Sequence, residues 1–403
     1  MQVFLLICLL FVCSMNVFAQ DKENIYGGSA VMQEPAKPSG MRGAATDLPD
    51  ISVVGEIVGK ACNIEGDIDK NKLNMRNVEF AYQGYIYPSM RANVILAFHK
   101  HEGNIESDIE EANVVFTNLF NAFSLKAGKM LGNFGIVNGF HPHHRPFVDQ
   151  PDVHKSFLGD HGLMLEGAAL NYLLPLPFFA EIEAGWGQTP AGHHHSTEEA
   201  QTADVLDTSG NTRTVDLHQE HEHTEFSLAD RVSTGRLKLS FPLGRDSELI
   251  SGISYAKGKG AHYLEHKDET QVSGVDLTFK LFPSAFSKFV WQNEYFILNR
   301  AVPIGTIKRN GFYSYLGYKA NQYWSFGARY DRTQDAFPHP DAAGLTNVDV
   351  SQATKAQSII VTRNLTETTY LRGQYKCYTE PEGRFEAFLQ MSFGIGPHSH
   401  PLE

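Results

Sequence analysis

The stretch FEAFLQMSFGI (residues 385–395) decides the fold class, because its apolar and polar side chains alternate with a period of two. A strand with this alternation presents one apolar face and one polar face. The apolar set is Phe385, Ala387, Leu389, Met391, Phe393 and Ile395, and the polar positions between them include Glu386, Gln390 and Ser392. Strands of soluble sheets usually have about five or six residues. This stretch instead matches the roughly nine to eleven residues that a tilted strand needs to cross a bilayer.

The same alternation recurs from Ile51 onward and predicts about sixteen strands, whereas helical periodicity hardly occurs. The predicted strands span residues 51–60, 74–86, 89–99, 105–118, 122–132, 162–174, 177–188, 232–241, 247–258, 269–281, 287–298, 307–319, 322–334, 353–363, 366–378 and 384–396. Aromatic residues gather near strand ends, as at Tyr85, Tyr87, Tyr323 and Trp324. Such clusters are typical of the two interfacial girdles of a membrane barrel.

The connections between these segments alternate between short and long. The long ones lie near residues 61–73, 100–104, 133–161, 189–231, 259–268, 299–306, 335–352 and 379–383. Short turns on one side and long loops on the other are typical of an outer-membrane barrel, whereas a soluble sandwich or propeller would not need this alternation. We therefore predict an all-β fold, a transmembrane antiparallel β-barrel of about 16 strands with short periplasmic turns and long external loops. The predicted localisation is the outer membrane of a Gram-negative bacterium.

The ends of the chain predict export. Residues 1–19, MQVFLLICLLFVCSMNVFA, read as a signal peptide, and their apolar run is too short for a membrane anchor, which is the alternative. Residues 20–50 are rich in Gly, Pro, Ala and Ser and are predicted to be a disordered periplasmic leader. Residues 51–396 form the predicted barrel and 397–403 a C-terminal tail.

Cys62 and Cys377 are the two cysteines that remain after removal of the signal peptide. They could pair in an oxidising compartment, although no pattern in the sequence shows it.

The polar faces of the predicted strands carry charges of both signs, which is typical of a water-filled lumen. The candidates are Glu79, Arg91, Lys126, Arg236, Lys238, Lys288, Glu294, Arg372, Lys376, Arg384 and Glu386. A sixteen-stranded barrel is too wide for side chains to fill it. The connection 133–161 is a candidate to narrow the pore, because it includes Phe134, Phe140, Phe147 and Phe157 and is less polar than a free loop should be.

If the connection 133–161 enters the pore, its histidines and aspartates line the constriction. The candidate metal ligands there are His141, His143, His144, Asp149, His154 and His161. Imidazole nitrogen and carboxylate oxygen suit zinc or another divalent ion. The alternative is a capping loop held by its own hydrogen bonds.

The connection 189–231 holds a second set of histidines, in TPAGHHHSTEE (189–199) and DLHQEHEHTE (216–225). The candidate ligands are His193, His194, His195, His218, His221 and His223. The segment has no apolar period, so it predicts a solvated external loop that collects Zn²⁺ weakly at several positions. Zinc is expected to be transported or loosely bound, and no cofactor is expected to be required.

Three segments resemble a group of Gram-negative outer-membrane porin-like proteins, described as uncharacterised or zinc-regulated and distantly similar to phosphate-selective porins. They are PDISVVGEIVG (49–59), LKAGKMLGNFGIVNGFHPHHRPFVDQP (125–151) and FEAFLQMSFGIGPHSHP (385–401). The resemblance covers most of the chain and implies an outer-membrane barrel connected with zinc supply. The positions that carry it are His141, Pro142, His143, Pro146, Phe147, Asp149 and Pro151.

The sequence thus predicts a porin-like channel for passive diffusion of small solutes, favouring or collecting zinc and other divalent cations, and not an enzyme. The expected partners are outer-membrane lipid or lipopolysaccharide and small solutes or metal ions, with a homotrimer left open. The net charge of −12 argues against nucleic acid. The main alternative is a non-conducting surface metal-binding protein or adhesin.

Two further alternatives are weaker. DISVVGEI (50–57) loosely resembles the coupling box of a TonB-coupled receptor, but the chain lacks room for a plug domain and a barrel of about 22 strands. An enzyme is disfavoured because neither GxSxG nor HExxH occurs in the chain.

Overall fold

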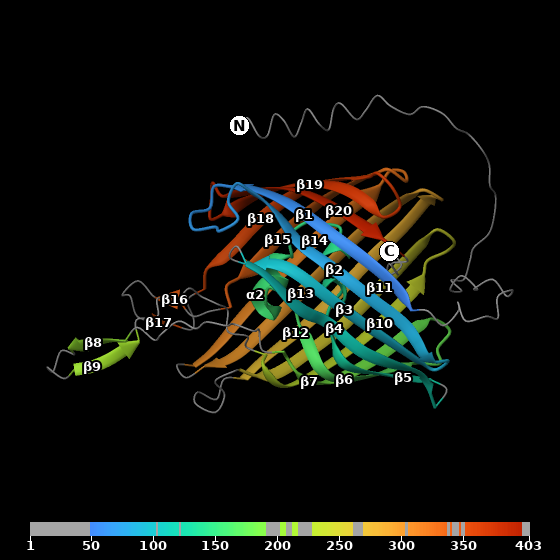
Figure 1. Ribbon diagram of the computed structural model, residues 1–403, viewed down its shortest axis with the longest axis horizontal. Coiled ribbons are helices and arrows are strands. Elements are labelled where there is room, and N and C mark those ends of the chain that lie inside the picture. The colour runs from blue at the N-terminus through green and yellow to red at the C-terminus, as the bar shows by residue number, and fades with distance from the viewer. Residues whose placement is uncertain are drawn as a thin grey trace, which may run out of the picture. The chain divides into compact units, whose positions relative to one another are not determined.

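Sixteen antiparallel strands close into a barrel in the computed structural model (Figure 1). The structure describes residues 49–101, 104–120, 122–190, 202–206, 212–216, 228–260, 269–302, 305–336, 339–340, 346–347 and 351–396. Neighbouring strands pair in sequence order, and β1 pairs with β20 to complete the ring. The predicted signal peptide 1–19, the leader up to residue 48 and the tail 397–403 lie outside the described residues, so their roles stay predictions.

The barrel strands are β1 (Asp50–Cys62), β2 (Lys72–Tyr87), β3 (Met90–His101), β4 (Asn104–Leu119), β5 (Phe123–Leu131), β6 (Met164–Leu173), β7 (Phe179–Gln188), β10 (Asp230–Pro242), β11 (Ser247–Lys259), β12 (Glu269–Ser284), β13 (Ser287–Val302), β14 (Gly305–Lys319), β15 (Trp324–Gln334), β18 (Ala353–Asn364), β19 (Thr369–Glu380) and β20 (Phe385–Ile395). Two hairpins stand apart from the ring, β8 (Thr202–Leu206) with β9 (Thr212–Asp216) and β16 (His339–Pro340) with β17 (Thr346–Asn347). The segment between β5 and β6 holds η3 (Val137–Gly139), η4 (Pro142–His144) and α2 (Asp152–Leu158).

The predicted fold class is confirmed. Each predicted strand corresponds to one barrel strand, and its ends differ from the observed ones by at most four residues. The hairpins and short helices were not predicted, because they lie in connections without a clear period. None of the helices in the described ranges is long and apolar enough to cross a membrane.

The two faces of the wall differ as the alternation requires. Along β14, Arg309 and Tyr313 are buried inward, whereas Leu316 and Tyr318 are exposed outward. The outward face is apolar over most strands, as shown by the exposed side chains of Phe80, Ile182, Trp186, Ile253, Val275, Tyr295, Phe326 and Ile359. An apolar exterior around a polar interior is the pattern of an outer-membrane barrel, in agreement with the predicted localisation.

The two cysteines of the barrel do not form a disulfide. Cys62, at the end of β1, is buried and Cys377, on β19, is half-buried, and both are free thiols. Lys376 is buried inward, so alternation turns the adjacent Cys377 outward. The pairing left open by the sequence is therefore absent from the described barrel.

Residues 132–163, here called the inserted loop, form the hydrophobic core together with the inner face of the wall. The loop contributes Phe134, Val137, Phe147, Val153, Phe157, Leu158 and Leu163, all fully or almost fully buried. The wall contributes Val232, Val272, Phe296, Leu298, Ile307, Tyr313 and Tyr315 among others. Because these wall residues face inward, the inserted loop lies in the lumen.

Candidate functional site

The inserted loop crosses the lumen and reaches wall strands that are far apart around the ring. Near its start, the backbone N–H of Gly135 donates to Ser254 Oγ on β11 at 3.0 Å. Further along, Val148 N donates to Gln374 Oε1 on β19 at 2.7 Å, and Val148 O accepts from Arg76 Nη1 on β2 at 2.7 Å. The structure therefore shows the loop inside the pore, as its apolar content suggested.

An apolar contact holds the middle of the loop against β14 and β15. The ring of Phe147 packs edge-on against Tyr313 and Tyr315, with centroid distances of 6.1 and 5.8 Å. The guanidinium carbon of Arg329 lies 4.6 Å from the centre of the same ring. Tyr315 fits because Gly317 and Gly327 leave room for its ring; a Cβ at Gly327 would lie 2.7 Å from it.

A buried ionic network holds the same part of the loop. Both carboxylate oxygens of Asp149 accept from Arg329 Nη2 at 2.8 Å, and Lys376 Nζ lies 3.1 Å from Asp149 Oδ2. Lys376 also pairs with Asp152 at 2.5 Å, and Arg329 pairs with Asp331 at 2.7 Å. Burial alone would raise the pKa of Asp149, but Arg329 and Lys376 lower it well below its ordinary value. Asp149 is therefore a charged anchor of the loop.

A second buried pair fixes α2 to β13. His154 Nε2 donates to Glu294 Oε2 at 2.6 Å, and neither side chain is exposed. The backbone N–H of Ile136 donates to the other oxygen of Glu294. Gly135 has a φ of +61°, and a Cβ there would lie 2.1 Å from that oxygen, so glycine is needed for the close approach. In the described structure His154 therefore anchors the loop to the wall, and it lies apart from the other histidines of the loop.

A cluster of histidine and glutamate lies where the loop meets β2 and β4. His141 Nε2 donates to Glu111 Oε1 at 2.8 Å. His141 Nδ1 lies 3.4 Å from Glu110 Oε1 and 3.8 Å from Glu79 Oε2. His143 Nδ1 lies 3.3 Å from Glu79 Oε1. We call these five residues the His–Glu cluster, and it combines nitrogen and oxygen ligands in the way that divalent metal sites do.

The electrostatics of the cluster are dominated by its carboxylates. Burial lowers the pKa of His141, but Glu110 and Glu111 outweigh burial and raise it well above its ordinary value. Lys126 Nζ lies 3.3 Å from Glu111 Oε2. Asn77 Nδ2 donates to Glu79 Oε1 at 2.7 Å. These carboxylates keep His141 protonated, so a divalent cation would bind there by displacing that proton.

A β-bulge brings two consecutive glutamates to the cluster. In the pairing of β3 with β4, Ile95 lies opposite Glu111 and Leu96 lies opposite Ile109, so Glu110 is the extra residue. In a regular strand Glu110 and Glu111 would point to opposite faces. The bulge redirects one of them, which is a common role of bulges next to functional sites.

The predicted metal ligands divide into several groups. His141 and His143 are brought together in the His–Glu cluster, and the ring of His144 lies 4.0 Å from that of His143, centre to centre, with the planes tilted by 51°. Asp149 instead belongs to the ionic network, and His161 is exposed. The loop spreads the six predicted ligands over different parts of the wall, and their binding of metal stays a prediction. His193, His194, His195, His218, His221 and His223 lie outside the described residues.

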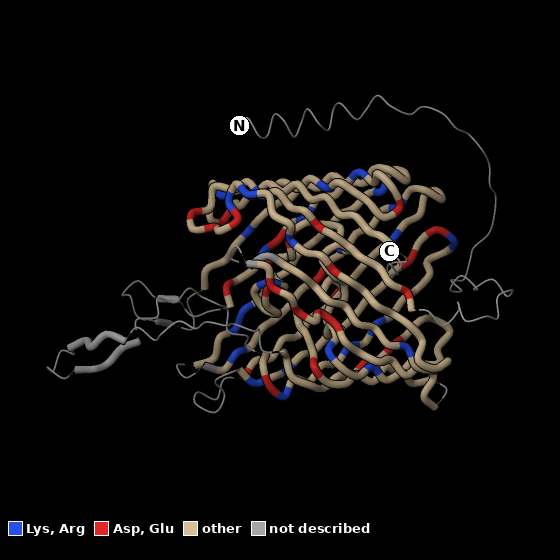
Figure 2. The backbone as a smooth tube through the Cα atoms, viewed as in Figure 1, with Lys and Arg blue, Asp and Glu red and all other residues tan. Residues whose placement is uncertain are grey.

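Sequence reasoning missed part of the site. Glu79 was predicted as a lumen charge but not as a ligand, and Glu110 and Glu111 were not singled out. Within a predicted strand, two adjacent glutamates break the alternation of apolar and polar residues. This break is the signal in the sequence that could have indicated a bulge. Arg329 and Asp331 were also missed as lumen charges, although Figure 2 shows acidic and basic residues on many strands of the barrel.

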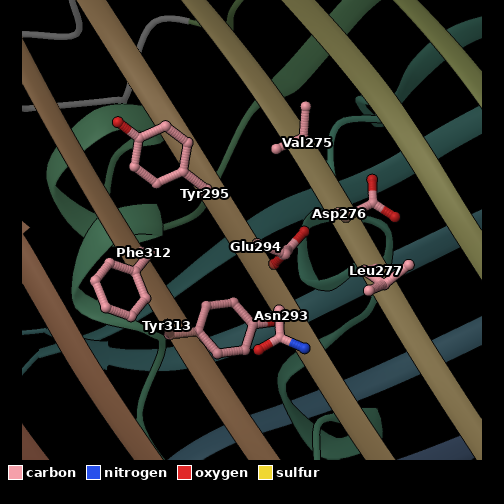
Figure 3. A pocket seen from close by; sticks show the side chains of 8 residues that line it. All are labelled: Val275, Asp276, Leu277, Asn293, Glu294, Tyr295, Phe312 and Tyr313. Atoms are coloured by element: carbon pink, nitrogen blue, oxygen red, sulfur yellow. The ribbon is translucent and has the colours of Figure 1, made fainter.

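A pocket of about 330 Å³ lies over β12, β13 and β14 (Figure 3). Its lining includes Val275, Leu277 and Tyr295, which are exposed on the outward face. The inward residues Glu294 and Tyr313 border it from the other side of the same strands. The pocket is therefore a depression of the membrane-facing surface and not a candidate solute site.

Comparison with solved structures supports the fold. A loop-deleted form of OmpT, an outer membrane protein of Vibrio cholerae, matches with a TM-score of 0.53 and 9% identity, over 86% of this chain and 99% of that one. OmpF of Salmonella typhi gives 0.51 and 10%, over 87% and 98%. The outer membrane channel DcaP of Acinetobacter baumannii gives 0.51 and 12%, over 88% and 99%. At these identities the likeness shows a porin-like barrel fold.

Sequence comparison adds one distant relative. A protein of Aquifex aeolicus strain VF5, described as uncharacterized, is 29% identical over an alignment of 324 residues that covers 73% of this chain. The match spans 64% of that protein, which is less than two thirds of its length. No family model matches the chain.

Proposed function

We propose that the protein is an outer-membrane channel for passive diffusion of small hydrophilic solutes, and that the inserted loop sets the width of the pore. The observation that carries the proposal is the position of the loop, anchored inside a sixteen-stranded barrel to both β2 and β15. Sixteen-stranded porins enclose an aqueous channel unless something narrows it. A loop held at several points on the wall would narrow this channel.

We further propose that divalent cations such as zinc are favoured. The wall at β2 and β4 offers the carboxylates of Glu79, Glu110 and Glu111 close together, with Lys126 and the buried Arg145 as neighbouring cations. The cations at β15 and β19 are instead matched by Asp149, Asp152 and Asp331. In a narrow polar passage, such a local excess of carboxylate attracts cations.

The histidine-rich connection 189–231 would collect zinc outside the pore, in line with the resemblance to zinc-regulated barrels. The apolar exterior fits outer-membrane lipid and lipopolysaccharide. One of the similar structures, in-vitro folded OmpT of Vibrio cholerae, is described as a trimer form, and we propose a homotrimer here.

A second candidate function is a non-conducting surface metal-binding protein. It is favoured by the dense packing of the loop, in which Phe134, Phe147 and Val153 are completely buried. Such packing is typical of a protein core and leaves little room for solutes beside the loop.

Single-channel recording in planar bilayers tests the proposal. We expect small conductance steps from the purified protein, with a reversal potential that favours cations in a salt gradient. A variant in which residues 134–160 are replaced by a short Gly–Ser linker should give larger steps. If both proteins fold and both are silent, the protein is a binder and not a channel. Steps that favour anions would contradict the cation preference alone.

A further inference from the structure

The geometry points to a single divalent metal site that joins the inserted loop to the wall. We propose that Glu79, Glu110 and His141 bind one ion of the Zn²⁺ class. Two ligands come from the wall strands β2 and β4 and one comes from the loop. The inference concerns the attachment of the loop, so it holds whether or not the barrel conducts.

The three ligand atoms are close enough to share one ion. One ligand atom from each of the three residues lies within 4.8 Å of the other two. Tetrahedral ligands about 2.0–2.1 Å from zinc lie roughly 3.3–3.4 Å from one another. His141 Nδ1 is already 3.4 Å from Glu110 Oε1 and 3.8 Å from Glu79 Oε2. The oxygens of Glu79 and Glu110 lie within 4.8 Å of each other, so side-chain movements of up to about 1 Å would complete the geometry.

Two buried atoms of the cluster point to a missing partner of this kind. His141 Nδ1 and Glu110 Oε2 are buried and make no hydrogen bond among the described residues; His141 Nδ1 has only the longer ion contacts at 3.4 and 3.8 Å. His141 is only 8% exposed. Buried polar atoms in proteins are nearly always paired, and leaving them unpaired is costly. A cation between the two side chains would satisfy both atoms at once.

The surrounding side chains orient the ligands. Glu111 accepts the Nε2–H of His141, which leaves Nδ1 turned toward Glu79 and Glu110. A carboxylate that holds the far nitrogen of a histidine ligand is common in metal centres. Glu111 is itself held by Asn113 at 2.9 Å and by Lys126 at 3.3 Å.

The donor set selects the class of ion. His143 Nδ1, 3.3 Å from Glu79 Oε1, stands next to the site and adds a second imidazole. Mixed nitrogen and carboxylate ligands suit Zn²⁺ and its transition-metal neighbours, whereas Ca²⁺ and Mg²⁺ prefer shells made of oxygen. Because His141 belongs to the loop, the bound ion would hold the loop against the wall.

Calorimetric titration of the full-length protein in detergent with ZnCl₂ tests the site. We expect one tight equivalent, followed by a weaker phase from the exposed histidines. Glu110→Gln should weaken the tight equivalent at least roughly 100-fold, because a ligand charge is lost. His161→Ala, which removes an exposed histidine of the same loop, is the matched control and should leave it unchanged. Zinc should also raise the unfolding temperature of the wild type but not of Glu110→Gln.

Several outcomes would overturn the inference. One is a tight equivalent that persists in folded Glu110→Gln, and another is equal competition by Mg²⁺ or Ca²⁺. If Glu110→Gln does not fold, the zinc-edge X-ray absorption spectrum of the wild type with one equivalent of zinc decides instead. It should show imidazole nitrogen and carboxylate oxygen at about 2.0–2.2 Å. A shell without imidazole would overturn the inference.

Discussion

Replacing Arg329 by methionine should loosen the inserted loop. The Arg329 side chain is completely buried and donates to both oxygens of Asp149 at 2.8 Å. It also pairs with Asp331 at 2.7 Å and covers one face of Phe147 at 4.6 Å. Methionine fills much of the same volume but carries no charge. Asp149 and Asp331 would then remain buried with one fewer cation.

The size of the effect follows from the burial of these charges. Removing one partner of a buried ion pair typically costs about 3–5 kcal/mol, because the other charge stays buried without its partner. When the inserted loop is docked on the wall, this cost acts on Asp149. When the loop is undocked, water can hydrate the Asp149 carboxylate. Each 1.4 kcal/mol is a factor of ten, so about 3 kcal/mol raises the undocked population of the loop roughly 100-fold.

Hydrogen exchange measured by mass spectrometry reports this population directly. Backbone amides in peptides from residues 132–163 should exchange about 100-fold faster in Arg329→Met, while strand amides stay protected. Arg332→Met is the matched control on the same strand, since Arg332 contacts Asn310 and not the loop. Equal exchange of the loop in two folded variants, Arg329→Met and Arg332→Met, would refute the view that this ionic network anchors it.

Three further predictions concern the same region. Phe147→Ala should weaken docking of the loop by about 3–5 kcal/mol, read as faster amide exchange, because it removes a fully buried ring. Gly327→Ala should destabilise the barrel by about 1–3 kcal/mol in denaturant unfolding, because its Cβ would lie 2.7 Å from Tyr315; Gly235→Ala, with open space around its Cβ, is the control. The pKa of Asp149 is lowered in the folded state, so its contribution is present above the ordinary value of about 3.9 and is lost only as pH falls through the lower folded pKa. Loop protection, corrected for the intrinsic exchange rate, should therefore not fall between pH 7 and pH 4.5, and a loss of protection between these values would contradict this anchor.

The strands could be predicted from sequence because two different solvents act on each one. Lipid outside and polar groups inside impose a period of two over roughly ten residues, as in residues 385–395 and 247–258. Connections have no such constraint, which explains why α2 and the two small hairpins were missed. Within the inserted loop, only its apolar content indicated burial, and that indication was correct.

The candidate site was harder to predict because its members come from distant parts of the chain. His141 and His143 were found from their residue type, but their partner Glu79 lies some sixty residues earlier. A period of two shows only that Glu79 faces the lumen, not which loop residue it meets. Arg329 and Asp149 are 180 residues apart, and their pairing depends on the path of the loop. Such pairs require the closed barrel to be known first.

The wall also explains how a loop with little regular structure can be buried. Its backbone carbonyls need donors, and buried carbonyls in proteins are nearly always paired. The wall supplies them from side chains: Tyr370 donates to His143 O at 2.8 Å, Arg372 to Arg145 O at 2.6 Å and Arg76 to Val148 O at 2.7 Å. In an open, water-filled lumen these three side chains would be hydrated and would require no particular partner. These three donors meet carbonyls within one short segment of the loop, residues 143–148, which indicates that the inner wall is matched to the docked loop.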